Sequence, residues 1–187
     1  MAIAHRENGD TAVLDCIIER LAPFNPDAVT ADMAKMLREY GLAVCVGDKY
    51  AAQWVVQSFA SKGIAYTYSH RDRSMIYSDV LPLFTSGRVR LLDNKKLVAQ
   101  FAGLERQTTS TRDKIDHPPG AHDDLANAAA GALVLAARTE ATSFVEPIVV
   151  SAPRTYFGDD PNINGGWVGG SGYAPHLDTY KTNWPVW

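Results

Sequence analysis

The residues best suited to chemistry lie in one stretch, where a turn is followed by two adjacent carboxylates. The turn is His-Pro-Pro-Gly at residues 117–120, and His122, Asp123 and Asp124 follow it; proline and glycine are typical of turns. A helix of small residues is expected from there to about Arg138. Asp is a preferred N-cap residue, so a lone Asp here would be interpreted as a cap. With two, we predict that one caps the helix while the other faces a metal ion, because hard divalent cations favour oxygen ligands.

A third carboxylate, Asp48, follows a short apolar run at residues 42–46. The run predicts a fully buried strand, and open α/β sheets bind ligands beyond the carboxyl ends of their strands. Asp48 could equally be a turn residue that caps the next helix. Two or three carboxylates that hold two divalent ions about 4 Å apart are the arrangement for phosphodiester hydrolysis. Oxygen ligands favour Mg²⁺ or Mn²⁺, and the chain contains no P-loop, nucleophile elbow or dinucleotide fingerprint.

A polar arm at residues 104–116 precedes the turn and is expected to form a hairpin or a flexible loop. A solvated loop is the simpler interpretation, but basic side chains beside carboxylates can also contact phosphates. The residues predicted to bind nucleic acid are Arg106, Arg112 and Lys114 of the arm, with Lys49 and His122 next to the carboxylates. The patch could extend to Arg71, Arg73, Arg88, Arg90, Lys95 and Lys96.

The composition is that of an ordinary globular chain of 187 residues, 46% of them hydrophobic, with a formal net charge of −3 and a pI near 5.9. Such a balance excludes a protein that holds nucleic acid by bulk charge. Cys16 and Cys45 lie in apolar runs and are expected to be buried free thiols of a reducing compartment. No signal peptide and no apolar run of about 18 residues is found, so we expect a soluble, intracellular protein without a membrane partner.

The order of elements predicts an α/β fold with a mixed sheet and helices on both faces. An antiparallel pair of strands opens the chain, and crossover-connected strands follow it. The expected strands are residues 1–5, 11–20, 42–46, 64–68 and 89–92, and the turn Asn8-Gly9-Asp10 joins the first two. The expected helices are residues 26–40, 51–62 with Trp54, Val55 and Phe59 inward, 71–83, and 95–103 capped by Asp93.

Several pieces of the chain together resemble the C-terminal nuclease domain of the large terminase subunit of tailed phages. The pieces are residues 2–6, 46–50, 104–106 and 117–128, and the resemblance covers about residues 1–138. It implies an RNase H-like fold and a metal-dependent endonuclease that cuts concatemeric double-stranded DNA during packaging in the cytoplasm of the host bacterium. It also implies that Asp48 belongs to the second acidic motif. The pair Asp123 and Asp124 matches the third motif, with Asp124 favoured as the inner metal ligand.

The resemblance has one gap. In the family, the first acidic motif lies on a strand just before the position of Met1, and an ATPase domain precedes the nuclease. We therefore expect this chain to lack the first catalytic strand, so that the nuclease domain at residues 1–138 is incomplete. Cleavage would then be impaired, or a separate upstream polypeptide would complete the site. The portal protein and the small terminase subunit are further implied partners.

Residues 139–187 are expected to form a linker and a Gly/Pro/Trp-rich tail with little structure of its own. Its aromatic residues Trp167, Tyr173, Trp184 and Trp187 could anchor a partner, although a plain disordered terminus is the simpler interpretation. An alternative function is therefore a non-catalytic packaging module that binds the portal protein. A third option is a junction resolvase, which would prefer branched to linear DNA.

Overall fold

A computed structural model describes residues 1–7, 9–48, 53–108, 113–138 and 148–149. These residues belong to one compact unit, Met1–Arg154. The predictions for Lys49, Arg112 and the aromatic tail lie outside the described residues. Among the helices that the structure describes, none combines the length and apolarity needed to cross a membrane.

The first sheet is built on a hairpin at the start of the chain. Strands β1 (Ala2–Glu7) and β2 (Thr11–Ile17) pair antiparallel, as predicted. Gly9 has a φ of 91° in the turn, a left-handed conformation that glycine adopts at little cost. Strand β5 (Val89–Arg90) adds to β2 in parallel, which gives the order β1-β2-β5.

The second sheet has the order β4-β3-β8 and is entirely parallel. It contains β3 (Val44–Gly47), β4 (Ala65–Tyr68) and β8 (Ile148–Val149). A separate antiparallel hairpin is formed by β6 (Glu105–Thr108) and β7 (Asp113–Asp116), so the polar arm is a hairpin. Parallel and antiparallel pairs together make the mixed α/β architecture that the sequence predicts.

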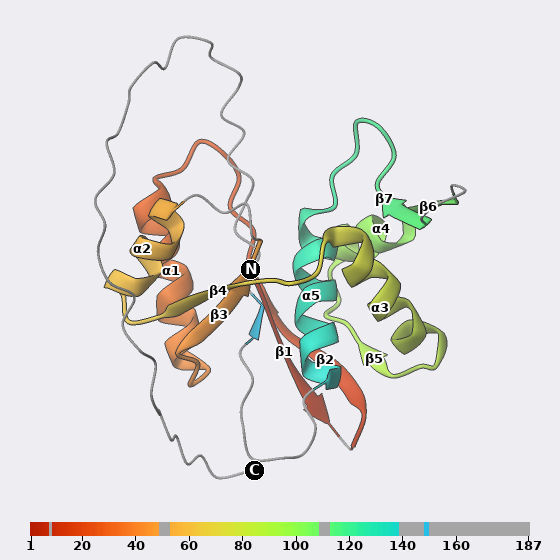
Figure 1. The fold of residues 1–187 in the computed structure, drawn as a ribbon, viewed down its shortest axis with the longest axis horizontal. Coiled ribbons are helices and arrows are strands. Elements are labelled where there is room, and N and C mark those ends of the chain that lie inside the picture. The colour runs from red at the N-terminus through yellow and green to blue at the C-terminus, as the bar shows by residue number, and fades with distance from the viewer. Residues whose placement is uncertain (8, 49–52, 109–112, 139–147, 150–187) are drawn as a thin grey trace. The chain divides into compact units, whose positions relative to one another are not determined.

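Two helices cover one face of the strands (Figure 1). Helix α1 (Pro26–Glu39) begins with proline at its first position, and the Asn25 side chain accepts hydrogen bonds from the amides of Asp27 and Ala28. Helix α2 (Gln53–Ser61) packs beside it. Their apolar side chains form one core with residues of β1, β3 and β4, including Ile3, Met33, Leu37, Cys45, Phe59 and Tyr66.

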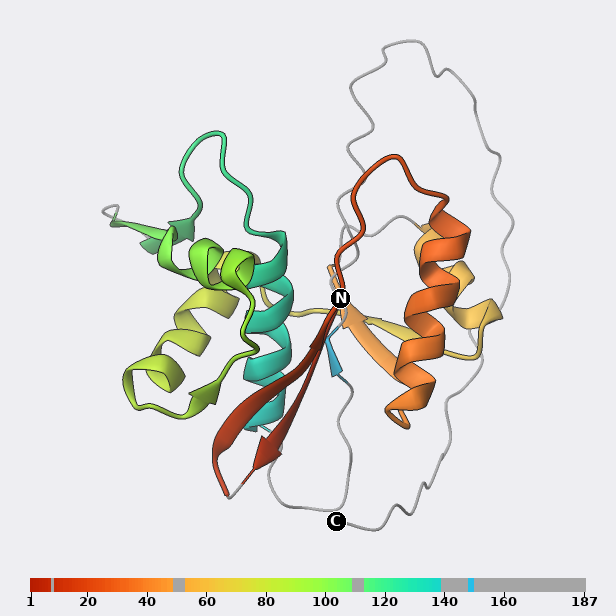
Figure 2. The ribbon, with the colours of Figure 1, turned by 180° about the vertical axis from the view of Figure 1, so that it is seen from behind.

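Three further helices form the second core (Figure 2). They are α3 (Arg73–Thr85), α4 (Lys95–Ala102) and α5 (Asp124–Arg138). Helix α5 contacts α3, α4, β1 and β2, so it lies at the centre of this group. Helices therefore pack on both faces of the strands.

Three details differ from the sequence-based expectations. Asn94, and not Asp93, caps α4, since its side chain accepts a hydrogen bond from the Leu97 amide at 3.0 Å. Trp54 is 38% exposed, whereas Val55 and Phe59 are buried in the core and Val56 packs against it. Both cysteines are free, but Cys16 is only partly buried. Cys45 is fully buried, and this burial raises the pKa of its thiol to about 12.

The end of β3 is shaped by a close contact between Gly47 and Tyr66. The Tyr66 hydroxyl donates a hydrogen bond to the carbonyl oxygen of Asp48 at 3.3 Å, and its ring also packs on Phe59 and Tyr68. A Cβ atom at residue 47 would overlap the Tyr66 ring and hydroxyl. Glycine at this position therefore lets the tyrosine cross β3 and hold the backbone that carries Asp48.

We expect Gly47→Ala to lower the free energy of unfolding by about 1–3 kcal/mol, because overpacking forces a buried aromatic ring or the strand to move. Gly103→Ala is the matched control. Its φ is −86°, and the nearest atom to its Cβ would be a backbone oxygen 3.2 Å away. Chemical denaturation of both variants measures the difference, and an equal loss in the two would contradict the assignment.

Candidate active site

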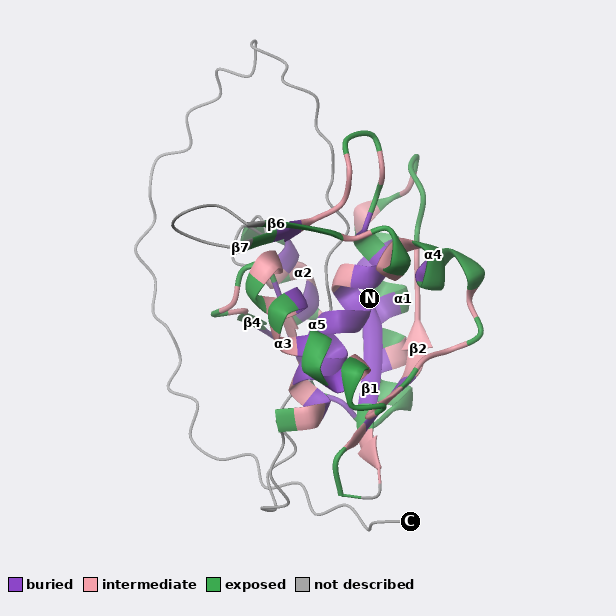
Figure 3. Ribbon diagram, turned by 90° about the vertical axis from the view of Figure 1, so that its right-hand side faces the viewer, coloured by how far each residue is buried: buried purple, intermediate pink, exposed green. Residues whose placement is uncertain are grey.

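The first turn of α5 is held on a rigid base, because the helix is made of small side chains that pack closely. Ala126, Ala129 and Ala130 are fully buried, and Ala2 and Ala4 of β1 belong to the same core. Figure 3 shows that α5 is largely buried, as is the first half of β1. Small side chains allow the helix axis to approach the strands, so the carboxylates at its start have little freedom of position.

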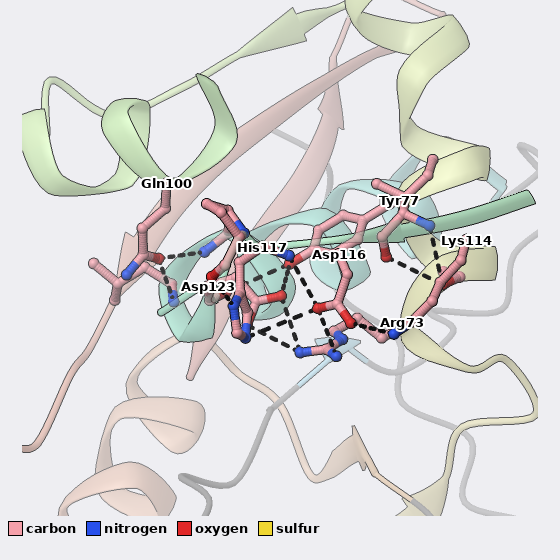
Figure 4. A network of polar contacts seen from close by, with 12 residues as sticks. Arg73, Tyr77, Gln100, Lys114, Asp116, His117 and Asp123 are labelled. Atoms are coloured by element: carbon pink, nitrogen blue, oxygen red, sulfur yellow. Dashed lines mark hydrogen bonds and ion pairs between the residues drawn. The ribbon is translucent and has the colours of Figure 1, made fainter. Parts of the chain in front are cut away.

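Asp123 immediately precedes α5 and its carboxylate is buried, with 6% of the side chain exposed. Both of its oxygens lie 3.2 Å from Nη1 of Arg73. The Tyr77 hydroxyl donates a hydrogen bond to Oδ2 at 2.8 Å. Burial and the neighbouring Asp123 raise the pKa of the Tyr77 hydroxyl, which therefore stays protonated and remains a donor. Figure 4 shows these contacts from close by.

Arg73 also joins Asp123 to the end of the β6–β7 hairpin. Its Nη2 lies 2.7 Å from the Asp116 carboxylate, and Lys114 contacts the other oxygen of Asp116 at 2.9 Å. Nε2 of His117 lies 3.7 Å from Asp123 and 3.8 Å from Asp116. A single guanidinium thus connects α3, β7 and the start of α5.

Asp116, His117 and Asp123 each offer one ligand atom, and the three atoms lie within 4.8 Å of one another. Such a donor set is chemically able to hold a metal ion. Here, however, Arg73 already contacts both carboxylates at hydrogen-bond distance. A cation in this place would have to displace the guanidinium, so the cluster fits a structural ion network better than a metal centre.

Helix α5 is capped by a residue from another helix. Oε1 of Gln100 on α4 accepts hydrogen bonds from the amides of Leu125 at 2.9 Å and Ala126 at 3.0 Å. The prediction that Asp123 or Asp124 caps the helix is therefore wrong for these two amides. The Asp123 side chain is instead directed to Arg73 and Tyr77 (Figure 4).

Asp124 and Asp48 differ from Asp123 in being exposed. Asp124 is the first residue of α5, where the helix dipole favours a negative charge. Its carboxylate interacts electrostatically with the amino group of Met1, whose pKa is lowered to about 6, mainly by burial. Asp48 directly follows β3 and is held by its backbone through Tyr66. Their carboxylates are accessible to an ion from solvent.

The predicted phosphate-binding residues have different surroundings. Lys114, Arg106 and His122 are all exposed, and Lys114 contacts Asp116. Most of the basic residues to which the predicted patch could extend form ion pairs with carboxylates of the protein. These pairs are Arg71–Asp79, Arg73–Asp116, Arg73–Asp123, Arg88–Asp10, Arg90–Glu7 and Lys96–Glu19.

Sequence reasoning missed the roles of four residues around this carboxylate group. Asp116 directly precedes the turn at residues 117–120, and this position in the sequence is the signal that could have identified it as part of the site. The sequence predicts Arg73 only as a possible phosphate contact, not as the partner of two carboxylates. Tyr77 and Gln100 lie on helices distant in sequence from Asp123, and no local pattern marks them.

We expect Arg73→Met to lower the free energy of unfolding by about 3 kcal/mol, because it leaves the buried Asp123 carboxylate without its cation. Arg71→Met is a matched control, since Arg71 is similarly exposed but its partner Asp79 is 26% exposed. Its loss should stay below about 1 kcal/mol. Urea denaturation of both variants tests the difference, and similar losses would refute the special role of Arg73.

Stability should also depend on pH through Asp116. Burial opposes ionisation, but hydrogen bonds from Lys114 and the His117 amide, with the charge of Arg73, hold the pKa of Asp116 below its usual value of 3.8. A carboxyl whose pKa is lowered by folding stabilises the folded state above its unfolded pKa and loses this contribution as the pH falls. Thermal unfolding below about pH 4 should therefore be less pH-dependent in Asp116→Asn than in the unmodified chain. Identical curves would count against this.

No family model and no curated protein matches the chain. Its structure is similar to crystal structures of the large terminase nuclease from thermophilic phage G20c. One has a TM-score of 0.54 at 19% identity and covers 72% of this chain and 81% of that chain. The structures with bound cobalt and with bound magnesium have TM-scores of 0.54 and 0.53, at 15% and 16% identity, and each covers 73% of this chain and 79% of that chain. The chain thus has the mixed α/β, RNase H-like fold of large terminase nucleases.

Proposed function

We propose that this protein is a metal-dependent endonuclease that hydrolyses phosphodiester bonds of double-stranded DNA, as the nuclease part of a phage DNA-packaging terminase. The proposal rests on the different environments of two adjacent carboxylates at the start of α5. Asp123 is buried and bound by Arg73 and Tyr77, while Asp124 beside it is exposed. The fold shared with terminase nucleases supports it.

Asp48 and Asp124 are the proposed metal ligands, and Asp123 has a positioning role. Two Mg²⁺ or Mn²⁺ ions suit such carboxylates, and when bound they would activate water and stabilise the leaving oxygen. The structurally similar large terminase nuclease from phage G20c has crystal structures with bound cobalt and with bound magnesium. Tyr66 orients the backbone of Asp48, and Gln100 and Arg73 fix the turn that carries Asp124. In this proposal the protein contributes to metal binding by holding the Asp48 and Asp124 carboxylates in fixed, accessible positions.

The substrate would be concatemeric double-stranded DNA in the cytoplasm of a bacterial host. Arg106, Arg112, Lys114, Lys49 and His122 are the proposed contacts to its phosphates. A portal protein, a small terminase subunit and an upstream ATPase polypeptide are the proposed partners.

Cleavage of linear and supercoiled plasmid in Mn²⁺ tests the proposal. We expect cleavage by the purified chain and loss of cleavage in EDTA. Cleavage should decrease more than about tenfold in Asp48→Asn and in Asp124→Asn, because each removes a metal ligand and even residues that only support a ligand are typically worth about 10–100-fold. Asp32→Asn is the matched control, since this exposed carboxylate lies on α1 and pairs with Arg20.

Mn²⁺ binding, measured by electron paramagnetic resonance, shows whether the metal is held by Asp48 and Asp124 or by the carboxylates around Arg73. The Asp48 and Asp124 variants should bind Mn²⁺ more weakly, whereas Asp116→Asn should bind it normally while folded. If only Asp116→Asn weakened Mn²⁺ binding, the metal would be assigned to the carboxylates around Arg73, and the proposed ligands would be refuted. A strong preference for branched DNA would indicate a resolvase instead.

A further inference from the structure

The first half of β1 is buried, although β2 pairs with only one side of the strand. Ala2, Ile3 and Ala4 are exposed by 0%, 1% and 3%, and among the strands that the structure describes only β2 is hydrogen-bonded to β1. Buried backbone amides and carbonyls need hydrogen-bond partners. The backbone groups of an exposed strand edge can form hydrogen bonds with water, whereas those of a buried edge need another strand as their partner.

The side chains of β1 and β3 divide between the same two cores. In β1, Ala2 and Ala4 belong to the core around α5, whereas Ile3 belongs to the core under α1 and α2. In β3, Val46 packs against the α5 core and Cys45 belongs to the α1–α2 core. Alternate residues of a strand point to opposite faces, so β1 and β3 lie in one layer between the two groups of helices.

Strand β8 is the described element that reaches both of these strands. It pairs in parallel with β3, with Ile148 opposite Cys45 and Val149 opposite Val46. It also contacts β1 and α5. In Figures 1 and 2 it is the short blue arrow beside β3. Its position beside β3 and its contacts with β1 point to the space between the two strands.

We propose that the space between β1 and β3 is a strand-binding slot, and that this chain fills it with its own strand Ile148–Val149. The inserted strand joins the two sheets into one. It thereby couples β3, which leads to Asp48, with β1, on which α5 and Asp124 rest. This inference does not depend on nuclease activity, because its tests measure only the position of the segment.

Disulfide trapping tests the proposed register with a thiol that the chain already has. In a Cys16→Ser background, Ile148→Cys places a second thiol opposite Cys45. Cys45 is fully buried and the pKa of its thiol is raised to about 12, so the chain is refolded with oxidised glutathione as the oxidant. Val149→Cys is the matched control, because it lies opposite Val46. The readout is non-reducing mass spectrometry.

We expect an intrachain disulfide between residues 45 and 148 in most of the Ile148→Cys chains, and little in the Val149→Cys control. A disulfide-linked dimer would show that a second copy fills the slot and would overturn the proposal. Equal trapping in both variants, or none in a folded chain, would also overturn it.

Hydrogen exchange provides a second readout that needs no new thiol. The full chain with Ile148→Pro and Val149→Pro should exchange the amides of β1 and β3 about tenfold faster or more, because the inserted strand is lost. The matched variant with Ile148→Ala and Val149→Ala keeps its backbone amides and should exchange near the original rate. Amides of α3 and α4 serve as the internal reference. Unchanged exchange in the proline variant would contradict the slot.

Discussion

A carboxylate that is removed from water needs a cation and hydrogen-bond donors close to it, and the start of α5 is organised around this requirement. Asp123 is the buried group, and Arg73 and Tyr77 satisfy it. Because Arg73 also contacts Asp116, the same guanidinium fixes the end of the β6–β7 hairpin relative to α3 and α5. The position of Asp124, one residue further along, follows from this network.

The second constraint is the close packing of the strands with the helices on each face. Alanines on α5 and β1 shorten the distance between helix and strand on one face. On the other face, Gly47 lets Tyr66 lie across β3 and reach the Asp48 backbone. In both places a small residue makes room for a contact that orients a carboxylate. The positions of the exposed Asp48 and Asp124 carboxylates are therefore determined by the packing of buried residues next to them.

Local patterns predicted much of the fold. The hairpin turn at Gly9, the proline at the first position of α1 and the small-residue helix α5 are all confirmed, because each depends on residues adjacent in sequence. The fold class also follows from the order of the elements. Capping was harder to predict: Asn94 and Gln100 replaced the expected Asp93 and Asp123 or Asp124, since several nearby oxygens can serve equally well.

The candidate site was only partly predictable for a related reason. The carboxylate pair Asp123 and Asp124 was visible in the sequence, but the residues that distinguish the two come from α3, a helix distant in sequence. Arg73 lies 50 positions from Asp123 and Tyr77 lies 46 positions away. Such contacts arise from tertiary packing and leave no local signature in the sequence.

The internal ion pairs of the basic residues affect how this protein could recognise a polyanion. Affinity for DNA rises with the number of phosphates neutralised, because each one releases condensed counterions. Arg71, Arg88, Arg90 and Lys96 are each paired with a carboxylate of the protein. Neutralising a phosphate with one of them would first require breaking that pair. These four residues should therefore add little to the salt dependence of DNA binding, which would come mainly from the proposed phosphate contacts Arg106, Arg112, Lys114, Lys49 and His122.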